Sequence, residues 1–222
     1  SLKAILAVRD KRLAQTIDTV LLYNGRGFTR FNTGMESTSS TGYGVAKYDN
    51  EAIPEGFRSQ SGKNYTHAPL FWLSVIYLNY AEACAEDDLD KSINLQKDRA
   101  GLPHLNPIVG FSDPANNHGV SDLIWEIRRE RRCELMFDND NRYWDLIRWH
   151  QLDKLDTTKY PDIILGANVA NDMDGCEANK VGKYIDGSKD GSRIYDKKHY
   201  LYPIPTGQIA LNPQLAPNNP GW

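Results

Sequence analysis

Glu130 and Glu134 are the residues whose type and spacing could most directly do chemistry. A spacing of four places both carboxylates on one face of a helix. Such a pair can serve a glycoside hydrolase as acid and base when it faces a cleft at ~5–10 Å, or it can bind a metal ion. However, no histidine lies beside the pair at zinc-ligand spacing. Neighbouring arginines also lower carboxyl pKa values, which does not suit a general acid.

The alternative interpretation is a buried network of ion pairs. At about 100° per residue, Glu130, Arg131 and Glu134 continue the apolar stripe of their helix, and buried charges must be paired. A turn at residues 138–141 then reverses the chain. The next helix carries the expected partners and the aromatic residues that would seal the corner, namely Arg142, Asp145, Arg148, Trp144 and Trp149. The arginines on the opposite side, Arg128, Arg129 and Arg132, are expected to lie in solvent.

These residues belong to a predicted helical core over residues 67–151. Its first helix, "APLFWLSVIYLNYAEACAE", is apolar on more than one face, so we expect it to be packed on several sides. A second helix begins at Asp88 or Asp90, ends at Ala100 and is stopped by Gly101.

The long charged helix of this core starts after Ser121, a natural N-cap, and runs to the turn at 138–141. A shorter helix over residues 142–151 follows it. Residues 24–66 and 153–222 are expected to be loop-rich, because Gly, Ser, Asn, Asp and Pro recur there at close intervals. The fold class is therefore mostly α with long irregular loops.

Bulk properties exclude several functions. The 222 residues carry a net charge of −3, so a general phosphate-binding role for nucleic acid has no support. No apolar run approaches the ~18–20 residues that span a bilayer. The stretch "NDMDGCE" lacks the pattern of a calcium loop and is interpreted as a turn. We expect neither a metal nor a cofactor.

Five stretches together resemble one known family. The segment "IRRERRCELMFDNDNRYWDLIRWHQL" is similar to the signature of SusD-like (RagB/SusD) proteins, an ER-x-x-EL helix followed by a turn and R-x-x-DL-x-RW. The remaining matches occur in the family's order: "RDKRLAQTI", "TGYGVAKY", "LFWLSVIYLNYAEACAE" with "INLQKDRAGLP", and "YLYPIPTGQIALNPQLAPNNPGW". Together they span nearly all of residues 1–222.

The resemblance implies a binding protein rather than an enzyme. SusD-like proteins have an α-α superhelix of tetratricopeptide-like helix pairs and are surface lipoproteins of the outer membrane. They capture glycans, or in some members peptides, for a SusC-like TonB-dependent transporter in polysaccharide utilization. The match implies a partial chain, the C-terminal part of such a domain, with the lipid anchor in the N-terminal part.

Glycan binding requires exposed aromatic faces beside hydrogen-bonding side chains. The loop region 24–66 offers this mixture in the candidates Phe28, Arg30, Phe31, Asn32, Tyr43 and Tyr48. Two other functions stay open from the residues alone. One is a glycoside hydrolase that uses Glu130 and Glu134 or Asp145, and the other is a helical module that binds another protein.

Overall fold

The computed structural model describes most of the chain. The described residues are 6–18, 21–23, 26–28, 41, 43–50, 52–58, 60–67, 69–84, 88–105, 113–116, 119–138, 141–168, 180–181, 184–187 and 191–222. Helices form the core of this part, and its strands are short. The mostly α fold class is therefore confirmed. None of the described helices is long and apolar enough to span a membrane.

Four helices form the predicted core: α4 (Leu73–Cys84), α5 (Ile93–Ala100), α6 (Asp122–Glu134) and α7 (Asn141–Arg148). A 3-10 turn, η2 (Leu89–Lys91), precedes α5. Two predicted helix boundaries are confirmed. The Ser121 side chain accepts the backbone N–H of Ile124 at 3.3 Å, as an N-cap does. Gly101 ends α5 with φ 62°, a conformation that glycine adopts without a steric cost.

Two helices end earlier than the sequence predicts. The charged helix α6 stops at Glu134, and Phe137 takes φ 65° in the turn that follows. Helix α7 stops at Arg148, and His150 takes φ 54°. The N–H of Gln151 then reaches back to the carbonyl of Leu146 at 2.8 Å, which closes the helix end.

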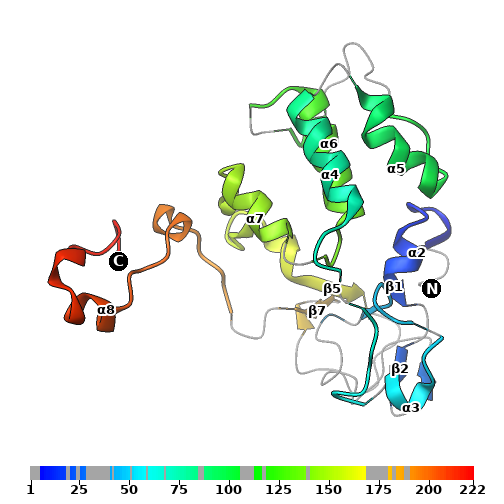
Figure 1. Ribbon diagram of the computed structural model, residues 1–222, viewed down its shortest axis with the longest axis horizontal. Coiled ribbons are helices and arrows are strands. Elements are labelled where there is room, and N and C mark those ends of the chain that lie inside the picture. The colour runs from blue at the N-terminus through cyan, green and yellow to red at the C-terminus, as the bar shows by residue number, and fades with distance from the viewer. Residues whose placement is uncertain are drawn as a thin grey trace.

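The hydrophobic core lies where α4, α5 and α6 meet (Figure 1). Its buried members are Leu78, Ala81, Ile93, Ile127 and Leu135. Three of them, Leu78, Ile93 and Ile127, have no exposed surface. The small Ala81 lets α4 approach its neighbours closely.

The expectation that α4 is packed on several sides is wrong for the described chain. Ser74, Leu78 and Ala81 are buried on one face. Leu73 and Ile76, on the opposite face, are 66% and 56% exposed. The described part of the chain therefore covers only one side of this helix.

Short elements surround the core. The N-terminal part holds α2 (Leu13–Thr16), the antiparallel pair β1 (Ile17–Asp18) and β4 (Gly44–Val45), the hairpin β2 (Leu21–Tyr23) and β3 (Arg26–Phe28), and α3 (Glu55–Arg58). After α7 come η3 (Leu152–Leu155), η4 (Pro161–Ile164), and a three-stranded antiparallel sheet of β5 (Leu165–Asn168), β7 (Tyr184–Asp186) and β6 (Lys180–Val181). The chain ends with η5 (Lys197–Tyr200), α8 (Thr206–Leu211) and η6 (Pro213–Leu215).

Several hydrogen bonds attach the C-terminal segment to the residues in and after η3, among them one from the N–H of Leu152 to the Tyr200 hydroxyl at 3.1 Å. The N–H of Thr157 donates to the carbonyl of Arg193 at 2.9 Å, and the N–H of Arg193 donates to the Thr157 hydroxyl at 2.9 Å. The N–H of Tyr195 donates to the Asp156 carboxylate at 3.2 Å. Beyond these contacts, residues 201–222 extend away from α4, α5 and α6 (Figure 1).

Candidate functional site

The two glutamates of α6 are buried in ion pairs. Arg12 Nη1 contacts Glu130 Oε1, and it lies 2.9 Å from Glu134 Oε2. Lys97 Nζ lies 2.9 Å from Glu130 Oε2, and Arg99 pairs with the other oxygen of Glu134. The burial and pairing predicted for both glutamates are confirmed. Their partners, however, come from residue 12 and from α5, and not from the helix that follows.

Arg131 forms the second half of the network with α7. Its Nε donates to Asp145 Oδ2 at 2.6 Å, and its Nη1 donates to Asn79 Oδ1 at 2.8 Å. Arg148 Nε donates to the other oxygen of Asp145 at 2.9 Å, and its Nη2 reaches Glu82 at 2.6 Å. The predicted corner of Arg131, Asp145 and Arg148 is therefore confirmed.

Three expectations about this corner are wrong. Arg142 forms no ion pair with any described residue, and burial together with the nearby charge of Arg132 lowers its pKa to about 10. Trp149 is buried and donates its indole N–H to Glu82 at 2.6 Å, whereas Trp144 is 54% exposed and does not seal the corner. Arg128 is not simply solvated, because its guanidinium lies 4.6 Å from the centre of the Trp149 ring.

This environment does not suit acid–base chemistry at α6. Burial raises the pKa of Glu130, but hydrogen bonds from Arg12 and Lys97 outweigh burial and hold the pKa below its usual range. Glu130 is therefore ionised at neutral pH and has no proton to give. Glu134 shares the same Arg12 nitrogen with it. The hydrolase hypothesis built on these two glutamates is contradicted. Asp145, its other candidate, is held between Arg131 and Arg148. Among the described residues, no group of three or more His, Cys, Asp or Glu is arranged to hold a metal ion.

The glycan-binding candidates from the loop region are only partly visible. Arg30, Phe31 and Asn32 lie outside the described residues, as do the stretch 171–177 and the side chain of Phe28 at the end of β3. Tyr43 precedes β4 and is half-buried.

Tyr48 connects its loop to the turn after α6. Its hydroxyl lies 2.8 Å from the carbonyl oxygen of Phe137 and 2.9 Å from Asp138 Oδ1. Lys47 Nζ lies 2.7 Å from the other Asp138 oxygen. Burial and the Asp138 carboxylate raise the pKa of Tyr48 to about 12. These contacts hold the Tyr48 hydroxyl against the turn after α6.

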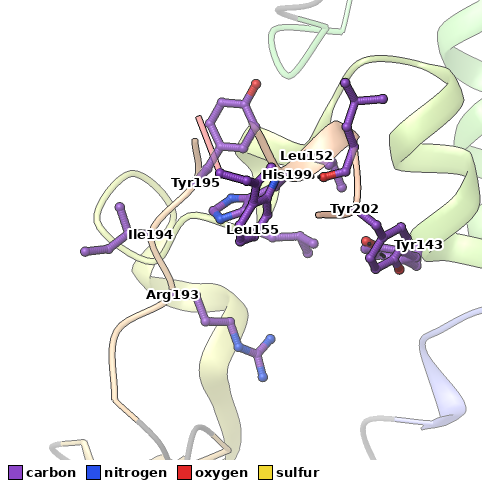
Figure 2. A pocket seen from close by; sticks show the side chains of 10 residues that line it. Tyr143, Leu152, Leu155, Arg193, Ile194, Tyr195, His199 and Tyr202 are labelled. Atoms are coloured by element: carbon purple, nitrogen blue, oxygen red, sulfur yellow. Dashed lines mark hydrogen bonds between the residues drawn. The ribbon is translucent and has the colours of Figure 1, made fainter. Parts of the chain in front are cut away.

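An aromatic pocket of about 290 Å³ lies between η3 and the C-terminal segment (Figure 2). It is lined by Tyr143, Leu152, Leu155, Arg193, Ile194, Tyr195, His199, Leu201, Tyr202 and Trp222. The Tyr143 and Tyr202 hydroxyls lie 3.3 Å apart. In Figure 2, His199 lies between this pair and Tyr195, and the Arg193 guanidinium points away from the aromatic rings.

Hydrogen bonds with the backbone hold two aromatic side chains of the pocket, His199 and Trp222, in position. His199 Nδ1 accepts the N–H of Asp196 at 3.0 Å, so the neutral imidazole carries its proton on Nε2. The Trp222 indole N–H donates to the carbonyl of Leu201 at 2.9 Å. Tyr202 and Trp222 are still 66% and 46% exposed. Fixed aromatic faces with hydroxyl and imidazole groups at their edges suit a ligand that has both apolar and hydroxyl-bearing surfaces.

The sequence did not predict this pocket, because most of its aromatic residues lie in residues 153–222, which were expected to be loop, and none lies in residues 24–66. The signal was present in "RIYDKKHYLYPIP", which contains three tyrosines and a histidine.

The packed helices α4, α5 and α6 and the buried ion-pair corner define a mostly helical protein. The SusD family model matches residues 10–222, so this chain belongs to the SusD family. A solved SusD-like protein from Bacteroides fragilis NCTC 9343 is 26% identical with a TM-score of 0.56, over 83% of this chain and 31% of that chain. A second solved chain, BT4246, shows the same fold at 23% identity and a TM-score of 0.50, over 83% of this chain and 29% of that chain.

This chain therefore spans about a third of the length of the solved proteins that it matches. No curated protein matches it.

Proposed function

We propose that this chain is part of a cell-surface protein that captures oligosaccharide for a SusC-like TonB-dependent transporter. The observation that carries the proposal is the SusD family match over residues 10–222. The partner transporter, the place at the outer membrane and a lipid anchor outside these 222 residues are parts of the same proposal. Peptide capture is the alternative.

The aromatic pocket is the candidate sugar-binding site. A sugar ring has apolar faces formed by its C–H groups and hydroxyls around its edge. The exposed rings of Tyr202 and Trp222 can contact such a face, while the Tyr143 hydroxyl and His199 Nε2 can exchange hydrogen bonds with the edge. The loop candidates, Phe28, Arg30, Phe31, Asn32, Tyr43 and Tyr48, are proposed as a second group of contacts.

A pair of variants of the native protein tests the pocket. The Tyr202→Ala variant removes an exposed ring from the pocket, and the Tyr65→Ala variant removes a ring of similar exposure, 61%, far away in the sequence. A panel of oligosaccharides first identifies a ligand, and calorimetry then measures its Kd. We expect Tyr202→Ala to raise the Kd at least tenfold and Tyr65→Ala to leave it within twofold. Equal Kd values for both variants would contradict the assignment of the pocket.

A further inference from the structure

A second pocket, of about 480 Å³, adjoins the aromatic pocket. Tyr143 and Leu155 line both of them, so these two side chains form a shared wall (Figure 2). Arg142 and Asp138 are the charged residues of the second lining, and Leu146 is one of its apolar residues. We call this space the Arg142 pocket. A ligand longer than one sugar residue can reach from the aromatic pocket into it.

Arg142 gives this pocket a positive charge that no described carboxylate pairs with. Its side chain is half-buried, and its guanidinium lies 5.9 Å from the centre of the Trp149 ring. Burial and the charge of Arg132 lower the pKa of Arg142 to about 10, which shows that its surroundings disfavour the cation. Because a buried charge is stable only when it is paired, an anion at this place would stabilise the guanidinium.

Two more cations lie near Arg142. Burial lowers the pKa of Lys154 on η3, and the charges of Arg142 and Arg132 lower it further. The three side chains are therefore close enough to repel one another. Arg132 is exposed, and the Lys154 ammonium lies 4.6 Å from the centre of the Trp125 ring. Neither of these two residues forms an ion pair with a described carboxylate.

The carboxylates around this pocket are occupied by other partners. Asp138 lies 2.7 Å from Lys47 Nζ and 2.9 Å from the Tyr48 hydroxyl. Both oxygens of Asp145 are held by arginines of the α6–α7 corner. Asp153 acts on Lys154 less strongly than the two nearby arginines do. The described residues thus leave the pocket with an excess of positive charge.

We propose that the Arg142 pocket binds the anionic group of an acidic oligosaccharide, a uronic acid carboxylate or a sulfate ester, while a neighbouring sugar residue occupies the aromatic pocket. The inference rests on the proposed function, because it assigns a substrate class to the same site. The planar guanidinium of arginine donates two parallel hydrogen bonds to a pair of anionic oxygens. A neutral sugar would leave the Arg142 charge unpaired, so the pocket discriminates by charge.

Calorimetry on the complete polypeptide, purified from its own cells, tests the inference with matched pairs of oligosaccharides. One set pairs uronic acid oligomers with the same oligomers after reduction of their carboxyl groups to alcohols. The other set pairs sulfated oligosaccharides with their desulfated forms. The comparison within each pair uses the wild-type protein, so it does not depend on the folding of a variant.

Three variants then locate the charge that discriminates. Arg142→Gln removes the cation from the pocket, and Arg142→Lys keeps the cation but not the planar fork. Arg129→Gln is the matched control, because it removes an arginine that pairs with Glu126 and does not line the pocket.

We expect the wild type to bind at least one acidic member with a Kd at least tenfold lower than that of its neutral counterpart. Arg142→Gln should bring the two Kd values within twofold, Arg142→Lys should retain part of the difference, and Arg129→Gln should retain all of it. The set that shows the difference identifies the group as a carboxylate or a sulfate.

Two outcomes would overturn the inference and leave oligosaccharide capture standing. The first is equal Kd values for the acidic and neutral members of every pair that binds. The second is a tenfold difference that persists in Arg142→Gln. Binding of no oligosaccharide, acidic or neutral, would instead contradict the proposed function and this inference with it.

Discussion

Arg12 and Glu130 form a buried ion pair although they lie 118 residues apart in the chain. The same guanidinium also holds Glu134 and, through its other nitrogen, Asp10 at 2.6 Å. One arginine from the N-terminal part thus joins three carboxylates. This contact connects the segment before α2 to the charged helix α6, so the "RDKRL" and "ERRCEL" stretches form a single structural unit.

Removing one carboxylate from this unit should lower the free energy of unfolding. The Glu134→Ala variant leaves Arg12 and Arg99 without one of their partners, and breaking a buried ion pair typically costs ~3–5 kcal/mol. We expect a loss of that size in the free energy of unfolding, measured by urea denaturation. The matched control is Lys91→Ala, which breaks a solvent-exposed pair and should leave the free energy of unfolding nearly unchanged. A comparable small change for Glu134→Ala would contradict the network.

The same network predicts a dependence of stability on pH. The pKa of Glu130 is lower in the folded state than its ordinary value of 4.5, despite burial, because Arg12 and Lys97 stabilise its charge. Its contribution is therefore fully present above pH 4.5 and is lost as pH falls through the folded pKa. Urea unfolding between pH 7 and pH 3 should show a decline below about pH 4.5, and Glu130→Gln should make that decline smaller. An identical decline in the variant would exclude Glu130 as its source.

Tyr48 should contribute to stability through its hydroxyl. The Tyr48→Phe variant removes the contacts with Phe137 and Asp138, and a hydrogen bond of this kind contributes ~1 kcal/mol. Because the folded pKa of Tyr48 is raised to about 12 by burial and Asp138, its contribution is present below pH 10 and declines as pH rises toward 12. Absorbance titration of tyrosinate compares wild type with Tyr48→Phe, and the ionisation step near pH 12 should be absent from the variant. A stability equal to wild type would leave Tyr48 available as a ligand contact.

The two faces of α4 should respond differently to truncation in the 222-residue chain. Leu78→Ala creates a cavity in the core and should cost ~2–5 kcal/mol. Leu73→Ala, on the exposed face of the same helix, should change stability by less than ~0.5 kcal/mol. Thermal or urea unfolding of the two variants gives a direct comparison. Equal losses would mean that the exposed face is already packed.

Local sequence signals predicted the parts of the fold that depend on neighbouring residues. Ser121 and Gly101 act at helix ends, and their effects need only the adjacent turns. The burial of Glu130, Arg131 and Glu134 followed from helical periodicity alone. The pairing of Arg131 with Asp145 was also predictable, because a short turn connects their helices.

Long-range partners were not predictable in the same way. Arg12, Lys97 and Arg99 reach the glutamates from 33 to 122 residues away, and no local pattern specifies which of 26 basic residues would do so. Periodicity also failed to separate Trp144 from Trp149, because α7 ends at Arg148 and Trp149 lies just beyond it, where helical periodicity no longer sets the direction of a side chain. The aromatic pocket needs the C-terminal segment to return to η3, which is a tertiary contact.

Oligosaccharide capture by the native protein is the most direct test of the account. The complete polypeptide, purified from its own outer membranes, would be equilibrated with a mixture of oligosaccharides and of peptides, and the bound molecules would be identified by mass spectrometry. We predict that oligosaccharide is retained and that Tyr202→Ala releases it. Retention of peptide alone, or of neither, would contradict the proposal that this SusD-family chain serves glycan uptake.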